Sequence, residues 1–246
     1  MKRSRKILIT IGIVIVIAVA AIAIYINDYY RAANSAQQCI TSPAEGVEVI
    51  TSDDDITVFA PEGEPQAGII FYPGGKVEAE SYAPLMEALA ERDMLAILVS
   101  MPGNLAVLDA DAAEGIQDEY PEIDTWYMAG HSLGGSMAAS YLGDEEDSFD
   151  GLILLASYST EDLSGTDLKV LSIYGDKDGV LDMKKYEENK VNLPDYFEEY
   201  IIQGGCHAYF GDYGAQEGDG QPEITVEEQI RVTADAMVIF IMDYSV

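Results

Sequence analysis

From residue 47 onward, apolar runs of β-strand length alternate with stretches of helical periodicity. The apolar runs are 47–51, 56–60, 67–72, 95–100, 125–129, 151–157, 168–174 and 197–203. Helical spacing of apolar residues occurs at 79–93, 105–120, 132–142, 181–191 and 225–244. Runs that are apolar almost throughout are typical of strands in a parallel sheet, which helices cover on both faces. The pattern predicts an α/β fold in one domain, residues 47–246, which opens with a hairpin around the turn-rich SDDD.

The N-terminal part of the chain has a different character. Residues 7–26 contain no charged side chain, and a helix of that length, at about 1.5 Å per residue, spans the roughly 30 Å hydrocarbon core of a bilayer. The run predicts one transmembrane helix. The alternative is a cleaved secretory signal, but its apolar region is usually about 7–15 residues long and ends at a small-residue cleavage site, which the following residues supply only loosely.

Charge predicts the orientation of this helix. Residues 1–6 carry four basic side chains, so we expect the N-terminus in the cytoplasm, a signal-anchor in the cell membrane at 7–26, and the catalytic domain outside the cytoplasm. Residues 27–46 are polar and Ala-rich and are predicted to form a stalk. The whole chain has a net charge of −31. A body this acidic repels phosphates, which argues against nucleic acid as a partner.

Between the strand at 125–129 and the helix at 132–142 lies the sequence Gly130-His131-Ser132-Leu133-Gly134. This G-x-S-x-G pattern, placed between a strand and a helix, is typical of a nucleophile elbow, in which a sharp turn exposes the serine hydroxyl above the sheet. We therefore predict Ser132 as a nucleophile.

A serine hydroxyl needs a base to remove its proton, and the usual base is histidine. The chain contains two histidines. His131 is adjacent to Ser132, so its side chain should point away from the hydroxyl, and we interpret it as a packing residue. His207 follows the last predicted strand, where a base is expected, and is the predicted base.

The acid that orients the base should lie between the serine and His207 in the chain. The segment IYGDKDGV offers Asp176 and Asp178. We predict Asp178, which lies beyond the Gly175 turn, and interpret Asp176 as a turn or capping residue. The oxyanion site should combine the Leu133 N–H with one N–H from the turn after the strand at 67–72, from either Gly75 or Lys76.

Five segments together resemble the bacterial fold-5 branch of the α/β-hydrolases, a dienelactone-hydrolase-like group that often carries an N-terminal membrane anchor. They are YPGGKVEAESYAPLMEALAE, GHSLGGSMAASY, LLASYSTEDLS, SIYGDKDGV and GGCHAYFGDYGAQEGDG. The resemblance covers residues 67–240. It implies an α/β-hydrolase fold with an eight-stranded, mostly parallel sheet, and a triad of Ser132 as nucleophile, Asp178 as acid and His207 as base. Cys206 and the acidic body depart from the pattern, and the resemblance implies a reaction type better than a substrate.

Only about ten residues separate the strands at 151–157 and 168–174, too few for a helical cap. We therefore expect an open mouth, walled by Tyr72, Tyr158, Tyr209 and Phe210. The predicted activity is that of a carboxylesterase-like serine hydrolase that needs no cofactor or metal and acts on a small-molecule or envelope-derived acyl substrate. The alternatives are an acyltransferase or envelope deacylase with the same triad, and a non-catalytic, membrane-tethered binding module.

Cys39 and Cys206 are the two cysteines of the chain. If the domain lies outside the cytoplasm, a disulfide between them could persist and would pin the stalk to the loop that carries His207. The alternative is two free thiols, with Cys206 buried as a small apolar residue. Their spacing in the sequence does not decide between these alternatives.

Overall fold

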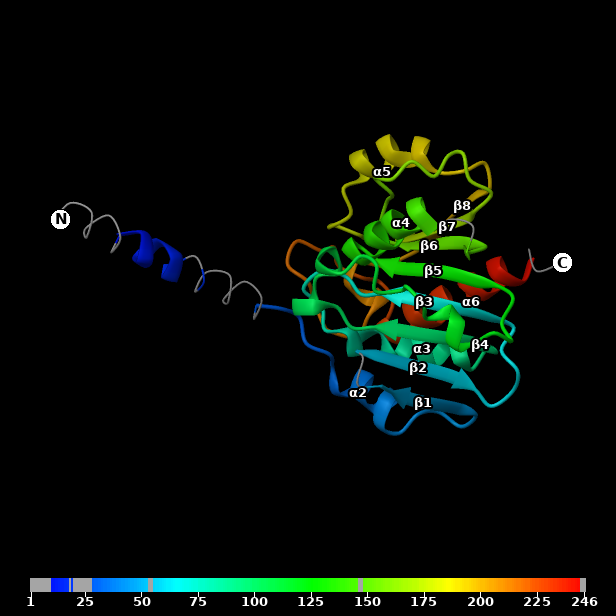
Figure 1. Ribbon diagram of the computed structural model, residues 1–246. Coiled ribbons are helices and arrows are strands. Elements are labelled where there is room, and N and C mark those ends of the chain that lie inside the picture. The colour runs from blue at the N-terminus through cyan, green and yellow to red at the C-terminus, as the bar shows by residue number, and fades with distance from the viewer. Residues whose placement is uncertain (1–9, 18, 20–27, 53–54, 146–147, 244–246) are drawn as a thin grey trace.

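The computed structural model describes residues 10–17, 19, 28–52, 55–145 and 148–243 (Figure 1). Its centre is an eight-stranded sheet with the order β1-β2-β4-β3-β5-β6-β7-β8. The strands are β1 (Val47–Thr51), β2 (Ile56–Pro61), β3 (Ala67–Tyr72), β4 (Met94–Val99), β5 (Trp126–His131), β6 (Gly151–Leu155), β7 (Lys169–Gly175) and β8 (Phe197–Ile202). β1 and β2 form the predicted antiparallel hairpin, β2 also pairs antiparallel with β4, and every other pairing is parallel. The predicted α/β fold, with its mostly parallel sheet, is confirmed.

The helices lie on both faces of the sheet, as expected. They are α2 (Asn34–Thr41), α3 (Ala83–Ala90), α4 (Leu133–Glu145), α5 (Met183–Asn189) and α6 (Val226–Asp243), and short 3₁₀ segments are η1 (Ala79–Tyr82), η2 (Pro102–Asn104), η3 (Ala106–Leu108), η4 (Gln117–Glu119), η6 (Lys190–Asn192) and η7 (Ala208–Phe210).

Two apolar cores follow from the alternation of side chains along the strands. On β3, Ile69 and Phe71 belong to the core that includes residues of α3 and α6, whereas Ile70 and Tyr72 belong to the core that includes residues of α4. All of β3 is buried because both of its faces are covered. Residues 156–168, between β6 and β7, contain no helix, so no helical cap is inserted at this point.

The helix predicted at 105–120 is wrong. The segment contains only the 3₁₀ turns η3 and η4. Val107 and Leu108, which the helical pattern would have buried, are 57% and 59% exposed, and Gly115 has a φ of 77°, outside the helical region. Aspartate side chains compete with helical backbone bonds, and here the Tyr72 hydroxyl bonds to the Ala110 carbonyl and the Ala113 N–H.

The N-terminal predictions fall partly outside the described residues. Residues 1–9, 18 and 20–27 are not described, so of the transmembrane helix predicted at 7–26 the structure covers 10–17, which is helical, and 19. In the part of the chain that the structure covers, we find no helix with the length and apolar character needed to cross a membrane.

Several described residues of the predicted stalk contact the domain. Tyr30 pairs with Val77 as an isolated bridge and donates its N–H to the Lys76 carbonyl at 2.7 Å. In α2, Ala36 is fully buried. The Ser35 hydroxyl donates to the Asp212 carboxylate. The described residues from Tyr30 onward thus contribute to the folded body.

Candidate active site

Ser132 occupies the turn between β5 and α4, with a φ of 52°. A positive φ costs energy for a residue with a side chain, and it is typical of the sharp turn that exposes a nucleophile. A β-carbon at Gly134 would overlap the carbonyl oxygens of Tyr72 and Pro73, so only glycine lets α4 start this close to the end of β3. The Ser132 N–H donates to Leu155 O at 2.9 Å, which ties the turn to β6.

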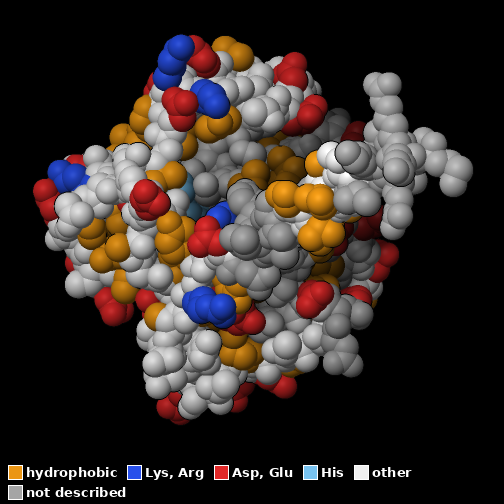
Figure 2. Space-filling model, turned by 90° about the vertical axis from the view of Figure 1, so that its left-hand side faces the viewer, with side chains coloured by type: hydrophobic (Ala, Val, Ile, Leu, Met, Phe, Trp, Pro, Cys, Tyr) orange, Lys and Arg blue, Asp and Glu red, His pale blue; other side chains and the backbone are white. Residues whose placement is uncertain are grey.

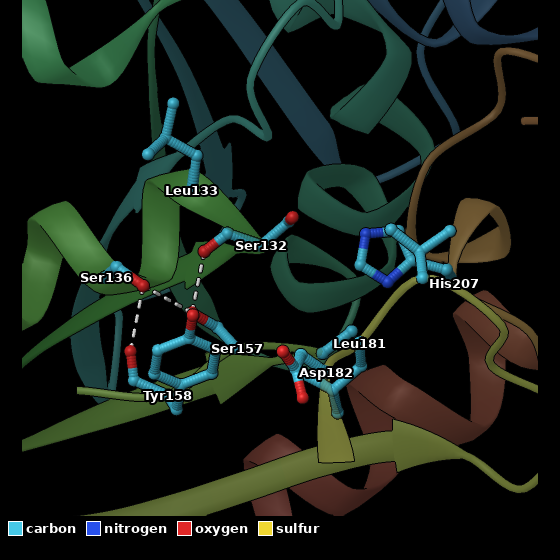
Figure 3. Close-up of a pocket in the computed structure, with 10 residues that line it drawn as sticks. Ser132, Leu133, Ser136, Ser157, Tyr158, Leu181, Asp182 and His207 are labelled. Atoms are coloured by element: carbon cyan, nitrogen blue, oxygen red, sulfur yellow. Dashed lines mark hydrogen bonds between the residues drawn. The ribbon is translucent and has the colours of Figure 1, made fainter. Parts of the chain in front are cut away.

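Hydroxyl groups support the turn from below. Ser157 donates its hydroxyl to Ser132 O at 2.6 Å, and Ser136 donates to Tyr158 O at 2.8 Å. The two supporting hydroxyls are 3.3 Å apart. Figure 3 shows the Ser132 side-chain oxygen on the other side of its backbone, directed toward the His207 ring. The hydroxyl is therefore not consumed by this network.

His207 lies between β8 and η7, and its ring faces the acid loop that follows β7. Its Nδ1 is 2.8 Å from Oδ2 of Asp178, and both side chains are only 2% exposed. The other oxygen, Asp178 Oδ1, accepts the N–H groups of Val180 and Leu181 at 2.8 Å each, which fixes the carboxylate. A buried carboxylate on Nδ1 leaves Nε2 as the working nitrogen of the ring. His207 Nε2 is buried and has no hydrogen-bond partner among the described residues.

Asp176 does not contact the histidine. Its Oδ1 accepts the Gly204 N–H at 2.6 Å, and its Oδ2 is 3.6 Å from the Lys177 ammonium. This contact joins the end of β7 to the turn after β8, so Asp176 has the turn-stabilising geometry expected of it.

The predicted oxyanion site lies where the turn after β3 meets the start of α4. A β-carbon on Gly75 would lie 2.9 Å from the Leu133 side chain, so the two residues are in contact. The Lys76 alternative is disfavoured, because the Lys76 N–H already donates to Asn104 O at 2.7 Å. Gly75 and Leu133 are the remaining pair of candidate donors.

His131 is buried as expected, and it also makes a hydrogen bond. Its Nδ1 is 2.7 Å from the Tyr82 hydroxyl, which also accepts the Gly74 N–H at 3.0 Å. Its ring centroid lies 4.5 Å from that of His207. Burial, and next the proximity of His207, hold the pKa of His131 well below its usual range. His131 is therefore a neutral ring that connects the oxyanion turn to the predicted base.

A cavity of about 250 Å³ opens beside Ser132 and His207. Its other lining residues are Leu133, Ser136, Ala156, Ser157, Tyr158, Val180, Leu181 and Asp182. Figure 2 views the molecule from the left-hand side of Figure 1, toward which the parallel strands point, and shows a histidine in a hollow on this face. The lining in the described structure contains Asp182 but no lysine or arginine.

Only one of the four predicted wall residues lines this cavity, namely Tyr158. Tyr72 is fully buried, and its hydroxyl donates to Ala110 O at 2.9 Å and accepts the Ala113 N–H at 2.7 Å. Phe210 is fully buried against His131, with ring centroids 5.5 Å apart. Tyr209 packs against the core that includes α3 and α6. Tyr72 and Phe210 are therefore part of the core, and Tyr209 is half-buried against it.

Several residues that line the cavity were not predicted from the sequence. Ser136 lies one helical turn after Ser132, and an (i, i+4) pair shares a helix face, so its position could have been deduced. Val180, Leu181 and Asp182 directly follow Asp178 in the chain. Ser157 comes from the next strand and carries no local signal.

The cysteines are both free thiols, which excludes a Cys39–Cys206 bridge in this structure. Burial raises the pKa of each thiol to about 12. Among the described residues, no group of three or more His, Cys, Asp or Glu side chains could hold a metal ion.

Comparison with known proteins gives a consistent result. The profile of the alpha/beta hydrolase family matches residues 68–231. A crystal structure of a predicted CIB-like hydrolase from Thermoplasma acidophilum superposes with a TM-score of 0.54 at 18% identity, covering 78% of this chain and 97% of that chain. At this identity the likeness concerns the fold alone. No curated protein matches the sequence significantly.

Proposed function

Because the chain belongs to the alpha/beta hydrolase family, we propose that it is a serine hydrolase that cleaves a carboxylic ester or related acyl bond. Ser132 is the proposed nucleophile, His207 the base and Asp178 the acid. The observation that carries the proposal is the buried His207–Asp178 pair, at 2.8 Å, because His207 and Ser132 line the same cavity and Nε2 has no other hydrogen-bond partner among the described residues.

The proposed reaction uses these groups in sequence. His207 Nε2 takes the Ser132 proton as the hydroxyl oxygen attacks the acyl carbonyl, and Asp178 stabilises the imidazolium that forms. The Leu133 and Gly75 N–H groups stabilise the oxyanion. His207 then protonates the leaving group, an acyl-enzyme remains on Ser132, and a water activated by His207 releases the acid.

The cavity favours a small acyl group. Its volume of about 250 Å³ lies just below the range of about 300–1,000 Å³ that is typical of drug-sized ligands. Asp182 is its one carboxylate apart from the triad, and the lining that the structure describes has no cationic side chain. We therefore expect neutral or cationic acyl groups to react faster than anionic ones. p-Nitrophenyl acetate compared with the p-nitrophenyl hemiester of succinic acid tests this, and equal kcat/KM for the two would contradict it.

The triad is tested by substitution. Ser132→Ala and His207→Ala should each lower p-nitrophenyl acetate hydrolysis by a factor of roughly 10³ or more, and the double variant should lose little further. Asp178→Asn should lower activity more than its matched control Asp176→Asn, because Asp178 contacts the His207 ring and Asp176 does not. Full activity in His207→Ala would refute the assignment.

Two other classes of function can be separated from an esterase by experiment. An acyltransferase or envelope deacylase would use the same groups and differ only in the acyl acceptor or the substrate, so product analysis with water and alcohol acceptors and with envelope extracts separates them from an esterase. A binding module would not react with a fluorophosphonate probe, whereas an enzyme should be labelled at Ser132.

We further propose that residues 7–26 anchor the domain in the cell membrane, with residues 1–6 in the cytoplasm and the domain outside. The uncharged run and the four basic residues before it support this orientation. Protease added to intact cells should digest the domain, and protection until lysis would contradict the proposal.

A further inference from the structure

Asp219 lies in the segment GDG at 218–220, in a stretch whose acidic composition suggests an ordinary solvated loop. Instead, its carboxylate collects four backbone N–H groups. Oδ1 accepts from His207 at 3.1 Å, from Gly179 at 3.1 Å and from Gly220 at 2.8 Å, and Oδ2 accepts from Ala208 at 2.9 Å. One side chain thus binds both the loop that carries the base and the turn that follows the acid.

The backbone around Asp219 is equally close to the acid loop. A β-carbon on Gly220 would overlap the Lys177 carbonyl, and one on Gly179 would lie 2.6 Å from the Gly218 carbonyl oxygen. The segment 218–220 therefore packs directly on the turn at 177–179. This close approach is what brings the carboxylate within reach of both loops.

Asp219 binds the backbone N–H groups of His207 and Ala208, which the other contacts of this loop do not hold. Gln229 holds Cys206 through both of its backbone groups, at 2.9 and 2.7 Å, and so fixes the chain before the histidine. Asp178 holds the His207 ring at Nδ1. Asp219 is the group that holds the His207 and Ala208 N–H groups and links them to the residue after Asp178.

The charge of Asp219 suits this role. Partial burial alone would raise its pKa, but the N–H groups of Ala208, Gly179, His207 and Gly220 outweigh burial and lower the pKa below its ordinary value. The carboxylate is ionised at neutral pH, and hydrogen bonds to an ionised acceptor are roughly twice as strong as neutral ones.

We propose that Asp219 is a positioning residue that sets the spacing between the base loop and the acid loop, so that His207 Nε2 faces Ser132 while Nδ1 stays on Asp178. The inference rests on the proposed hydrolase function for its kinetic consequence. Its structural content, the placement of the His207 ring on Asp178, can be measured without any substrate.

The test uses the full-length protein and the variant Asp219→Asn, which keeps the size of the side chain but removes its charge and one acceptor. Glu217→Gln is the matched control, because Glu217 lies two residues away on the same loop and is exposed. The readouts are kcat and KM for p-nitrophenyl acetate, with kcat normalised to sites titrated by a fluorophosphonate, and the downfield proton NMR signal of the His207 Nδ1–H.

We expect Asp219→Asn to lower kcat per titrated site by about 10- to 100-fold with KM changed less than about threefold, because displacement by about 1 Å is enough for a loss of that size. Its downfield signal should shift or broaden. Glu217→Gln should match the wild type in both readouts. If Asp219→Asn does not fold, Asp219→Glu, which keeps the charge but displaces the carboxylate, should show the same kinetic loss.

Three results would overturn the inference. The first is a wild-type kcat and an unchanged downfield signal in Asp219→Asn. The second is a loss of active sites and of stability with an unchanged kcat per site, which would indicate a purely structural role. Failure of both variants to fold would have the same meaning. If the wild type shows no Ser132-dependent turnover, the proposed hydrolase function fails instead, and the NMR signal alone decides the role of Asp219.

Discussion

Removing one buried oxygen atom, in Tyr82→Phe, tests how the oxyanion turn and the elbow are held together. Tyr82 is fully buried, and burial raises the pKa of its hydroxyl well above 10, so the group is neutral at any ordinary assay pH. It accepts the Gly74 N–H at 3.0 Å and contacts His131 Nδ1 at 2.7 Å. Phenylalanine keeps the ring contacts with Phe71 and Tyr213 but leaves both polar groups without a partner.

The magnitude follows from those two groups. A buried donor or acceptor that loses its partner costs about 1–3 kcal/mol, so two should lower the free energy of unfolding by about 2–6 kcal/mol. The effect on catalysis should be smaller than the loss of a whole oxyanion donor, which costs about 10²–10³ in kcat. Gly74 is adjacent to the proposed donor Gly75, so we expect kcat to fall by less than about 10²-fold, with little change in KM.

Urea denaturation followed by fluorescence measures the stability change, and p-nitrophenyl acetate hydrolysis measures the kinetic one. Tyr141→Phe is the matched control, because Tyr141 is also largely buried but its hydroxyl makes no hydrogen bond to a described residue. It should change stability by less than about 0.5 kcal/mol. A loss below about 1 kcal/mol in Tyr82→Phe would refute the reasoning, since it would mean that water or a rearrangement replaces both hydrogen bonds.

Three further predictions concern the elbow, pH and the thiols. Gly134→Ala should abolish fluorophosphonate labelling and strongly reduce stability, because its β-carbon overlaps two carbonyl oxygens, whereas Gly165→Ala, which meets no atom within 4 Å, should be tolerated in both assays. The low pKa of buried His131 means that the unfolded chain binds a proton that the folded chain does not. The contribution of His131 to the free energy of unfolding should therefore be constant above about pH 6.5 and decrease toward pH 5, by at most about 1.4 kcal/mol per pH unit. In urea titrations at several pH values, His131→Gln should reduce the dependence of stability on pH. An unchanged dependence would contradict the prediction. Alkylation under denaturing conditions without reductant should modify both Cys39 and Cys206, and mass spectrometry that detects a linked pair would overturn the free-thiol assignment.

Local patterns predicted a large part of this fold and of its candidate site. The strand runs are continuous apolar segments, and burial on both faces of the sheet requires that composition wherever the strand lies. The elbow is local in part, because a β-carbon on Gly130 would overlap the backbone of Gly134 and Gly135, whereas the atoms that require glycine at position 134 belong to Tyr72 and Pro73 at the end of β3. His207 could be selected because the chain contains only two histidines and the other is adjacent to Ser132.

Long-range contacts decided the rest, because the direction of a side chain or N–H group depends on what covers it. Tyr72 ends β3 on the face covered by α4, so it is in the core and not in the mouth. The Lys76 N–H is taken by Asn104, 28 residues away, and Asp219 binds Gly179 across 40 residues. No periodicity or short motif records partners at such separations. Tertiary packing alone determines which of several chemically suitable residues faces Ser132.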